Sequence, residues 1–540
     1  MHRARLVSIP HFRPSLRLLV TLLVALVLTG PRVGAASSIA SRVLIDPEGE
    51  NNADFFGTSI AWVGDINTDG YDDILVGAFR YPEIGSIGRA YVYFGGPAMD
   101  AVADLVISPP AGGAGWFGVS VGSAGDFNGD GAADFIVGAR QAGNEGRAFI
   151  YYGGPSLDTT PDVTLIGEST GSLTAFGAAV ASAGDLNQDG FDDVIVGAPQ
   201  YGVGGRVYVY FGGAIPDAIP DRVFTALGAY DELGDVVGSA GDMNGDGHPD
   251  LFASAPANDA AALNAGAIYV WFGGPGFDTN ADLTLLGSGI NDHLMNAANA
   301  GDVNGDGSSD LIGAGRNQVR VWFGGSSPNA TSDLALASSY SSVAGAGDLN
   351  GDGIDDFVVG APLYGTGGRA SFFFGGSAVD MIEDMHFVGD QPGISLGQGV
   401  AGGGHVDGQG PTDFVVSSYY DPDATGYNRG RVFVFANSLS PTGVPLPAKV
   451  AGLSFAGARP NPAFHEVRLV LELSHSVPVR ITVYDLTGHE VARPVSDERL
   501  TGRVTRVWRP GSLPSGVYYV RAALGDLEQV RKVIWLGESP

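Results

Sequence analysis

The sequence predicts an all-β fold: a seven-bladed β-propeller followed by a small immunoglobulin-like β-sandwich. Three observations carry this prediction. A unit of about 60 residues recurs through three-quarters of the chain, as in repeat proteins. Each unit offers four short strand candidates and shows no helical periodicity. Glycine is abundant, with 84 residues, while 44% of all residues are hydrophobic, so the composition is that of short strands joined by tight turns.

The repeat is clearest in three copies. The segment FGTSIAWVGDINTDGYDDILVGA at residues 56–78 recurs at 117–139 and at 176–198. Looser copies begin near four further residues: Leu233, Leu294, Ser342 and, in the most degenerate copy, Leu396. We therefore predict that residues 41–436 form the seven blades of the propeller.

Each copy supplies the strands of one blade. In the first copy the strand candidates are Ser59 to Gly64, Ile74 to Ala78, Ala90 to Phe94 and Asp104 to Ile107. Third-strand candidates occur seven times, but fourth-strand candidates follow them only six times. The missing strand is SRVLID at 41–46, which precedes the first copy. The first strand of the chain is therefore expected to complete the last blade and close the ring.

Six copies share the pattern D-x-N-x-D-G-x-x-D in the loop between the first two strands. Oxygens at the first, third and fifth positions of a curled loop converge. The glycine at the sixth position permits the turn, the seventh offers a backbone carbonyl, and the Asp at the ninth completes the shell. Hard oxygen ligands in this number suit Ca²⁺. We predict one structural calcium ion in each of the six loops, with these ligands: Asp65, Asn67, Asp69, Asp73; Asp126, Asn128, Asp130, Asp134; Asp185, Asn187, Asp189, Asp193; Asp242, Asn244, Asp246, Asp250; Asp302, Asn304, Asp306, Asp310; Asp348, Asn350, Asp352, Asp356.

Two other interpretations of these loops were weighed. An EF-hand needs Glu at the twelfth position and flanking helices. Here the twelfth positions fall inside apolar strand candidates, at Val76, Val137, Val196, Ala253, Gly313 and Val359. An Asx-rich turn without metal stays open, since Asp, Asn and Gly form turns by themselves. The seventh loop has lost its first carboxylate and is expected to hold no metal; it contains His405, Asp407, Gln409, Gly410 and Asp413.

The ordered combination of Phe-Gly, acidic loop and Gly-Ala-Pro resembles the FG-GAP repeats of the integrin α-chain propeller. The resemblance covers about 41–436 and rests on the six loops and on these motifs: Phe56-Gly57, Phe117-Gly118, Phe176-Gly177, Gly197-Ala198-Pro199 and Gly360-Ala361-Pro362. It implies calcium loops on the lower face, a binding or adhesion surface on the opposite rim and no catalysis. The fifth and sixth copies depart from the pattern, because they lack Phe-Gly.

By this resemblance, the loops between the second and third strands lie on the binding rim. Their tyrosines are candidate ligand contacts: Tyr81, Tyr201, Tyr364, Tyr419, Tyr420 and Tyr427. The alternative is that these tyrosines only cover a glycine-rich surface. Both interpretations remain open at this point.

The N-terminus predicts export. Arginines precede an apolar run at 18–28, and Ala35 ends a small-residue cleavage site, so residues 1–35 are expected to be a signal peptide. A membrane anchor would need a span of about 20 apolar residues, so no membrane span is expected after cleavage. Cysteine is absent, which excludes disulfides.

Charge separates the two predicted domains and excludes one class of partner. Residues 36–436 contain 12 Arg, no Lys and 50 acidic residues, whereas residues 452–540 contain 11 basic and 9 acidic residues. Nucleic-acid binding requires clustered Lys and Arg, so a nucleic-acid partner is not expected.

After a Pro-bearing linker at 437–451, the repeat ceases. Residues 452–540 offer six or seven strand candidates, which predict an immunoglobulin-like domain. Its motifs resemble C-terminal domains that direct bacterial proteins through type IX secretion, and related FlgD-type immunoglobulin-like modules: Pro460-Asn461-Pro462, Val483-Tyr484-Asp485, Ser515-Gly516-Val517-Tyr518 and Arg531-Lys532-Val533-Ile534. The resemblance implies a sorting domain that is read by the secretion machinery. A plain spacer domain is the alternative.

Together these observations predict a secreted or cell-surface calcium-binding scaffold for adhesion or ligand binding, located outside a bacterial cell. Its partner would be an extracellular protein or glycan. The alternative is a structural envelope or surface-layer component without a specific ligand. An enzyme is not expected, since no catalytic motif is found in the sequence.

Overall fold

The computed structural model divides the chain into two compact units, Met1–Val444 and Pro445–Pro540. It describes residues 41–45, 54–82, 85–97, 99–111, 115–226, 228–337, 342–389, 393–420, 429–437, 454–459, 467–484, 489–510, 513–514, 516–524 and 527–535. The predicted signal peptide lies outside the described residues, as does the predicted linker after Asn437. Every regular element of the described residues is a strand, and among them no helix is long and apolar enough to cross a membrane.

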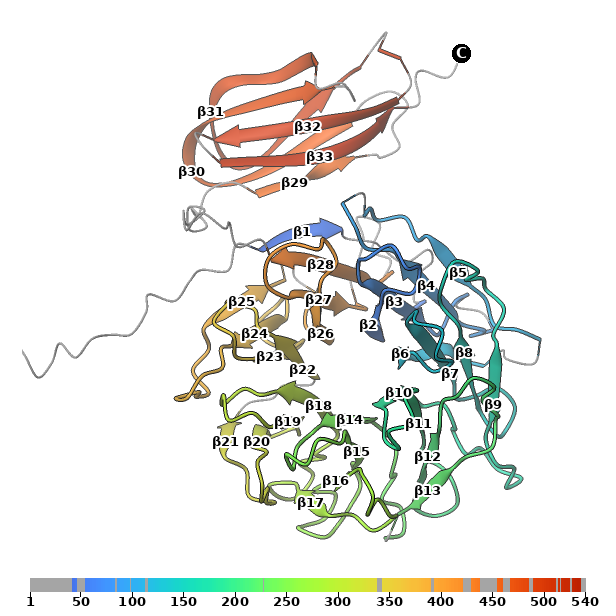
Figure 1. Ribbon diagram of the computed structural model, residues 1–540. Coiled ribbons are helices and arrows are strands. Elements are labelled where there is room, and N and C mark those ends of the chain that lie inside the picture. Colours follow the sequence, from blue (N-terminus) through green and yellow to red (C-terminus); the bar gives the residue numbers. More distant parts are fainter. Residues whose placement is uncertain are drawn as a thin grey trace, which may run out of the picture. The chain divides into compact units, whose positions relative to one another are not determined.

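The first unit contains seven sheets of four antiparallel strands in its described part (Figure 1). The first sheet consists of β2 (Ile60–Gly64), β3 (Asp73–Ala78), β4 (Arg89–Tyr93) and β5 (Leu105–Ile107). The second consists of β6 (Phe117–Gly125), β7 (Asp134–Ala139), β8 (Arg147–Tyr151) and β9 (Val163–Ile166). The third consists of β10 (Ala179–Gly184), β11 (Asp193–Ala198), β12 (Arg206–Tyr210) and β13 (Arg222–Thr225).

The remaining four sheets follow the same order. The fourth consists of β14 (Val237–Gly241), β15 (Asp250–Ala255), β16 (Ala267–Trp271) and β17 (Leu283–Leu286). The fifth consists of β18 (Asn296–Gly301), β19 (Asp310–Ala314), β20 (Gln318–Trp322) and β21 (Leu334–Ala337). The sixth consists of β22 (Ser342–Gly347), β23 (Asp356–Ala361), β24 (Arg369–Phe373) and β25 (Met385–Val388). The seventh consists of β26 (Gly399–Gly404), β27 (Asp413–Ser418), β28 (Arg431–Asn437) and β1 (Ser41–Ile45).

The sheets lie around a common centre, with the first strand of each sheet innermost (Figure 1). The first strands contact one another in sequence, and β26 of the seventh sheet contacts β2 of the first. As predicted, the first strand of the chain completes the last sheet, since β1 pairs antiparallel with β28 from Ser41 opposite Asn437. Repeated four-stranded sheets of this kind fit a β-propeller.

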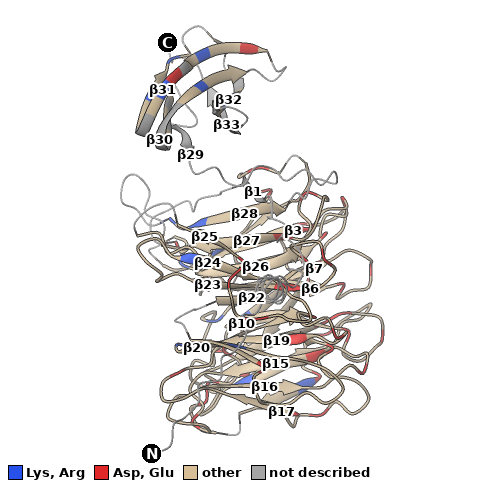
Figure 2. Cartoon of the chain, turned by 90° about the vertical axis from the view of Figure 1, so that its left-hand side faces the viewer, with Lys and Arg blue, Asp and Glu red and all other residues tan. Residues whose placement is uncertain are grey.

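Antiparallel order within each sheet places the connections at two ends of the unit. The loop between the first and second strands lies at one end, which we call the acidic-loop end. The loop between the second and third strands lies at the other end, together with the connection that enters the next sheet. Basic residues are sparse in this unit (Figure 2).

Hydrophobic side chains fill the space between neighbouring sheets. Leu75 and Val92 of the first sheet pack with Phe135 and Phe149 of the second, and all four are buried. The second strand of every sheet is buried along its whole length. A strand that is buried on both faces needs apolar residues in succession rather than in alternation, which explains runs such as ILVGA.

Two glycines of the repeat meet at the junction between sheets. A Cβ on Gly77, at the end of β3, would overlap the carbonyl oxygen of Gly118, near the start of β6. The same close approach joins three further pairs: Gly138 and Gly177, Gly197 and Gly234, Gly360 and Gly397. Between the seventh and first sheets, Ser417 instead donates a hydrogen bond of 2.7 Å to the carbonyl oxygen of Gly57. The Phe-Gly and Gly-Ala motifs are therefore two sides of one contact.

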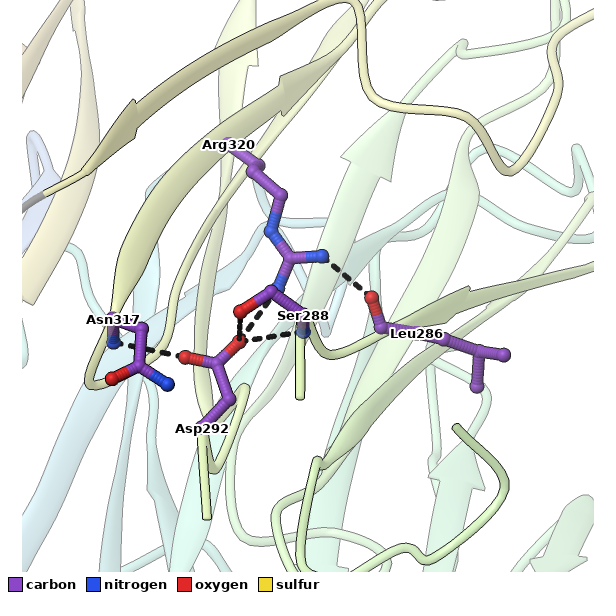
Figure 3. Close-up of polar contacts among 5 residues, drawn as sticks. All are labelled: Leu286, Ser288, Asp292, Asn317 and Arg320. Carbon is purple, nitrogen blue, oxygen red and sulfur yellow. Dashed lines mark hydrogen bonds and ion pairs between the residues drawn. The ribbon is translucent and has the colours of Figure 1, made fainter. Parts of the chain in front are cut away.

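The fifth sheet, whose second and third strands are joined by a very short loop, contains a buried ion pair (Figure 3). Nη2 of Arg320 lies 3.1 Å from Oδ2 of Asp292, and both side chains are almost fully buried. Ser288 donates to the same oxygen of Asp292 through its amide and its hydroxyl, each at 2.7 Å. The amide of Asn317 donates to the other oxygen at 2.9 Å. The short loop is thus held by a carboxylate from the preceding connection.

The second unit is a single five-stranded sheet in its described part. Its order is β29 (Ser454–Arg459), β30 (Val467–Tyr484), β32 (Gly516–Leu524) and β33 (Leu527–Trp535), with β31 (Glu490–Trp508) paired to β30. It has its own core, which includes Leu469, Ile481, Trp508 and Val520. The strand candidate VRLVLEL and the first six residues of VRITVYDL fall within one long strand, β30, whose pairing with β31 shifts register between Leu473 and Val477. The described part of the second unit contains five strands, and the expectation of six or seven strands over 452–540 stays a prediction.

Candidate functional site

The acidic loop between β2 and β3 folds back on its own side chains. The amide of Asp69 donates to Oδ1 of Asp65 at 3.0 Å and to Oδ1 of Asn67 at 2.9 Å. The amide of Gly70 donates to Oδ2 of Asp65 at 2.8 Å. Because one N–H group serves two acceptors, the oxygens at the first and third loop positions lie close together. Gly70 has a φ of +92°, which permits the sharp turn.

The fifth position joins the same cluster of oxygens. Oδ1 of Asp69 accepts from the amide of Tyr71 at 3.1 Å, and its Oδ2 accepts from Nδ2 of Asn67 at 3.0 Å. All six predicted loops repeat the bonds from the fifth and sixth amides to the first carboxylate, at Asp65, Asp126, Asp185, Asp242, Asp302 and Asp348. The structure therefore brings the first, third and fifth positions together in every loop.

The ninth-position Asp lies in a different environment from the other three. Oδ2 of Asp73 accepts from the amide of Ile66 at 3.0 Å, and its Oδ1 accepts from the amide of Gly95 at 2.8 Å. Asp73 is fully buried. It therefore ties the acidic loop to the end of the third strand, a role that the sequence pattern did not reveal.

This backbone clamp occurs in all seven sheets, including the one whose loop was expected to be empty. In the seventh loop Asp413 accepts from the amides of Val406, at 2.8 Å, and Asn437, at 2.6 Å. Burial raises the pKa of each ninth-position carboxyl to about 7, against the lowering effect of the backbone hydrogen bonds, at Asp73, Asp134, Asp193, Asp250, Asp310, Asp356 and Asp413. The retention of Asp413 without a first-position carboxylate was the available signal for this structural role.

The donor chemistry of each loop fits a hard cation. The converging set consists of two carboxylates and one amide oxygen, which are ligands that Ca²⁺ takes. Within the described residues, no three Asp, Glu or His side chains are arranged as a ready metal site. This agrees with the position of Asp73, whose two oxygens face backbone amides of Ile66 and Gly95, whereas the partly exposed Asp65 and the exposed Asp69 accept amides of their own loop.

Neighbouring acidic loops are also joined to each other. The amide of the eighth residue of one loop donates to the carbonyl oxygen of the first residue of the loop before it. The bonds are 2.9–3.4 Å long and run from Ala133 to Asp65, Asp192 to Asp126, Ser309 to Asp242, Asp355 to Asp302, Thr412 to Asp348 and Asp72 to His405. The third and fourth sheets lack this bond because Pro249, at the eighth position, has no N–H group.

The rim tyrosines of the sequence prediction fall into two groups. An arginine at the start of the third strand stacks on Tyr81, Tyr201 and Tyr364, with guanidinium-to-ring distances of 3.8, 3.9 and 4.7 Å from Arg89, Arg206 and Arg369 respectively. Tyr201 also donates a hydrogen bond of 2.9 Å to Glu168. These three rings thus cover arginines of their own sheets.

Tyr419 and Tyr420 form the second group. Their ring centroids lie 4.5 Å apart, and both rings contact Phe55 of the neighbouring sheet. The sequence prediction had not included Phe55. Tyr427 lies outside the described residues.

The segments that match known protein families coincide with copies of the repeat. The FG-GAP repeat family matches residues 56–93, 117–151, 176–210 and 236–271, and an FG-GAP-like repeat matches residues 302–359. The chain therefore contains FG-GAP repeats. Among curated proteins, this FG-GAP repeat protein is 34% identical to integrin alpha-5 of Xenopus laevis over 168 residues, which are 29% of this chain and 16% of that one. It is 37% identical to integrin alpha-6 of Gallus gallus over 155 residues, which are 28% of this chain and 14% of that one.

A third relative extends the aligned region. Integrin alpha-4 of Xenopus laevis is 32% identical over 232 residues, which are 39% of this chain and 21% of the integrin. The FG-GAP repeat protein thus spans about a fifth or less of the length of these relatives. Among solved structures, one match is PorZ, which is described as a surface component of the type IX secretion system of Porphyromonas gingivalis. The match covers 92% of this chain and 61% of the PorZ chain, with 13% identity and a TM-score of 0.40.

Proposed function

We propose that this FG-GAP repeat protein is a calcium-braced, seven-bladed propeller that acts outside the cell or on its surface as a scaffold for adhesion or ligand binding. The observation that carries the proposal is the identical folding of six acidic loops. In each of them the first carboxylate accepts two backbone amides and shares one of these amides with the third-position oxygen. The ninth-position Asp has its own role as a buried backbone clamp, but a turn that needed no metal would not require further acidic side chains at both the first and the fifth positions in six copies.

Within each loop, calcium would be held by the side chains at the first, third and fifth positions and the backbone carbonyl at the seventh. The ninth-position Asp, which is fixed by two backbone amides, would hold the loop in place and could offer its remaining lone pairs to the ion. A divalent cation supplies positive charge that offsets the repulsion between the clustered carboxylates. The loop with His405 at its first position would remain without metal.

We propose further that the ring of sheets is closed. Three observations support closure: β1 completes the sheet of β28, β26 contacts β2, and the amide of Asp72 reaches the carbonyl oxygen of His405. Closure protects strand edges, which would otherwise invite pairing with other chains. A closed ring also gives the connections at the rim a rigid support, as binding loops require.

We infer that the second unit is an immunoglobulin-like sorting domain, through which the protein is exported by secretion machinery after cleavage of residues 1–35. The separate core around Leu469 and Trp508 supports its treatment as an independent domain. The propeller would then act by binding an extracellular protein or glycan, without catalysis and without nucleic acid.

A ligand screen tests this function. The purified full chain is presented to glycan and extracellular-protein arrays in millimolar calcium and again in EGTA. The proposal predicts at least one ligand that is retained in calcium and weakened in EGTA. Variant Asp126→Ala should weaken this binding, whereas His405→Ala, in the seventh loop, should not. Absence of any ligand in both conditions would contradict the adhesion role and favour a structural envelope component.

A further inference from the structure

Five aromatic side chains form a continuous row at the end of the first unit opposite the acidic loops. We call this row the aromatic arc; it consists of Phe55, Phe79, Trp116, Tyr419 and Tyr420. Successive ring centroids are 4.5–5.4 Å apart, from Tyr420 through Tyr419, Phe55 and Phe79 to Trp116. Tyr419 and Tyr420 directly follow β27, Phe55 precedes β2, Phe79 follows β3, and Trp116 directly precedes β6. These strands belong to three neighbouring sheets (Figure 1). The arc therefore crosses two junctions between sheets.

The arc differs from the aromatic pairs that fill the core. The stacked pairs Phe135–Tyr151 and Phe357–Phe373 are buried almost completely. In the arc, by contrast, Tyr420 is 40% exposed and the other four rings are partly exposed. A contiguous exposed aromatic patch on a soluble domain marks a binding surface more often than scattered apolar residues do.

The backbone holds two of these rings in an unfavourable conformation. Phe55 and Trp116 have φ values of +58° and +60°, in the left-handed region that bulky side chains rarely adopt. The equivalent residue of the third sheet, Ala175, has the same φ of +56° but carries no ring. The turn itself therefore does not require an aromatic residue. Strain of this kind persists where a function needs the side chain.

Two arginines bring positive charge to the arc. The guanidinium of Arg80 lies 5.1 Å from the ring centroid of Phe55, and that of Arg140 lies 5.7 Å from the ring centroid of Trp116. Nε of Arg140 is buried and has no hydrogen-bond partner. Among the described residues, neither guanidinium has a carboxylate within 4 Å. Burial raises the pKa of Asp235, and the nearby Arg140 partly opposes this rise.

Other arginines of the same unit do form ion pairs. Arg206, Arg320 and Arg369 are paired with Glu168, Asp292 and Glu383 respectively. Residues 36–436 contain only 12 Arg and no Lys beside 50 acidic residues (Figure 2). Two guanidinium groups with no carboxylate within 4 Å among the described residues, set among partly exposed rings, therefore bring positive charge to a predominantly acidic surface.

We propose that the aromatic arc binds an acidic oligosaccharide, a chain of sugar rings with repeated carboxylates, and this deepens the proposed function, on which it rests. The apolar faces of the sugar rings would stack on the aromatic rings, while the carboxylates would accept hydrogen bonds from Arg80 and Arg140. Guanidinium groups suit this task because they donate to both oxygens of a carboxylate. The hydroxyls of Tyr419 and Tyr420 would bond the sugar hydroxyls.

The chemistry of the arc favours a sugar over a peptide. Peptides commonly add a strand to an exposed sheet edge or lay a helix into a groove. The arc consists of loop side chains and offers no strand edge. Ring faces and cations recur along it, since Arg80 stands over its middle and Arg140 at its Trp116 end. An acidic polysaccharide repeats the complementary ring and carboxylate in the same way.

The test uses the full chain in calcium and three probes in titration calorimetry. The first probe is an octasaccharide of alternating glucuronate and N-acetylglucosamine, the second its carboxyl-reduced counterpart, and the third a decaglutamate peptide. We expect binding of the acidic octasaccharide, binding of the reduced form weaker by about tenfold, and no tighter binding of the peptide. Equal affinity for the two sugars, tighter binding of the peptide, or no binding of the octasaccharide would overturn the proposal.

Variants locate the binding to the arc. Trp116→Asn removes the ring but tolerates the left-handed backbone, and it should weaken binding of both sugars. Arg140→Gln should weaken only the acidic sugar. The control Leu363→Ser, which alters a side chain that is 83% exposed at the same end, should leave binding unchanged, and equal melting temperatures establish that the variants are folded. Unchanged binding of the acidic octasaccharide by the Trp116→Asn variant would overturn the proposal. If, in addition, a ligand from the array screen binds that variant, the assignment of binding to the arc is wrong while the wider scaffold function stands.

Discussion

Asp72 and His405 are 333 residues apart in the chain, yet they join the first and seventh sheets through a reciprocal pair of hydrogen bonds. The amide of His405 donates to Oδ2 of Asp72 at 2.8 Å, and the amide of Asp72 donates to the carbonyl oxygen of His405 at 3.4 Å. The same carboxylate-to-amide contact joins Asp192 to Asp126 and Asp355 to Asp302. The contact between the first and seventh sheets is therefore of a kind that also occurs between consecutive sheets.

Replacement of Asp72 by Ala should destabilise the closing junction. The variant leaves the amide of His405 without its side-chain acceptor, and a hydrogen bond of this kind contributes about 1 kcal/mol. Urea unfolding of the full chain measures the loss. Glu232→Ala, which removes a negative charge from an exposed side chain, serves as the control. An unchanged urea midpoint for Asp72→Ala would show that the contact does not hold the junction.

Replacement of Gly77 by Ala should weaken the packing between the first and second sheets and destabilise the protein. Its Cβ would overlap the carbonyl oxygen of Gly118, and backbone on both sides leaves no flexible side chain to move. We expect a loss of about 1–3 kcal/mol, as for other overpacked sites. Gly276→Ala is the matched control, because nothing lies within 4 Å of its Cβ position. Equal melting temperatures for the two variants would refute the packing argument.

The Asp292–Arg320 pair should show strong coupling in a double-mutant cycle. Asp292→Asn leaves the buried guanidinium of Arg320 without its counter-charge and should cost about 3–5 kcal/mol. The double variant Asp292→Asn with Arg320→Met removes both charges and should recover most of this loss. Unfolding midpoints in urea give the coupling energy. A double variant that is no more stable than Asp292→Asn alone would contradict the pairing.

The buried Asp413 should make stability depend on pH. Its folded pKa of about 7 lies above the ordinary value of 3.8, so its contribution is fully present below about pH 4 and is lost as the pH rises through 7. Asp413→Asn lacks this dependence. From pH 5 to pH 8 the variant should therefore gain about 1–3 kcal/mol relative to the natural chain, since one pKa unit corresponds to about 1.4 kcal/mol. A constant difference across this range would contradict the raised pKa.

The sequence was sufficient to predict what depends on short-range pattern. The strands follow from apolar runs bounded by Gly and Asp, and the count of fourth strands led to the pairing of β1 with β28. The convergence of Asp65, Asn67 and Asp69 likewise follows from their spacing. These features lie within one copy of the repeat or in the number of copies.

The sequence was not sufficient where function depends on contacts between copies or on the direction of a side chain. Asp73 was assigned to the metal shell, but a motif does not show that its oxygens face two backbone amides. The aromatic arc was missed because Phe55 and Tyr419 meet only across the closing junction. The doublets Phe55-Phe56 and Trp116-Phe117, with a bulky aromatic residue where the third and fourth copies have Ala175 and Glu232, were the available signal.

The most direct test of the account is the calcium content of the purified full chain after dialysis against millimolar calcium, measured by elemental analysis together with the melting temperature in calcium and in EGTA. We predict six calcium ions per chain, five in Asp126→Ala and six in His405→Ala. EGTA should lower the melting temperature, because each site at a tenfold excess over its Kd contributes about 1.4 kcal/mol. A protein that holds no calcium and melts at the same temperature in EGTA would contradict the account.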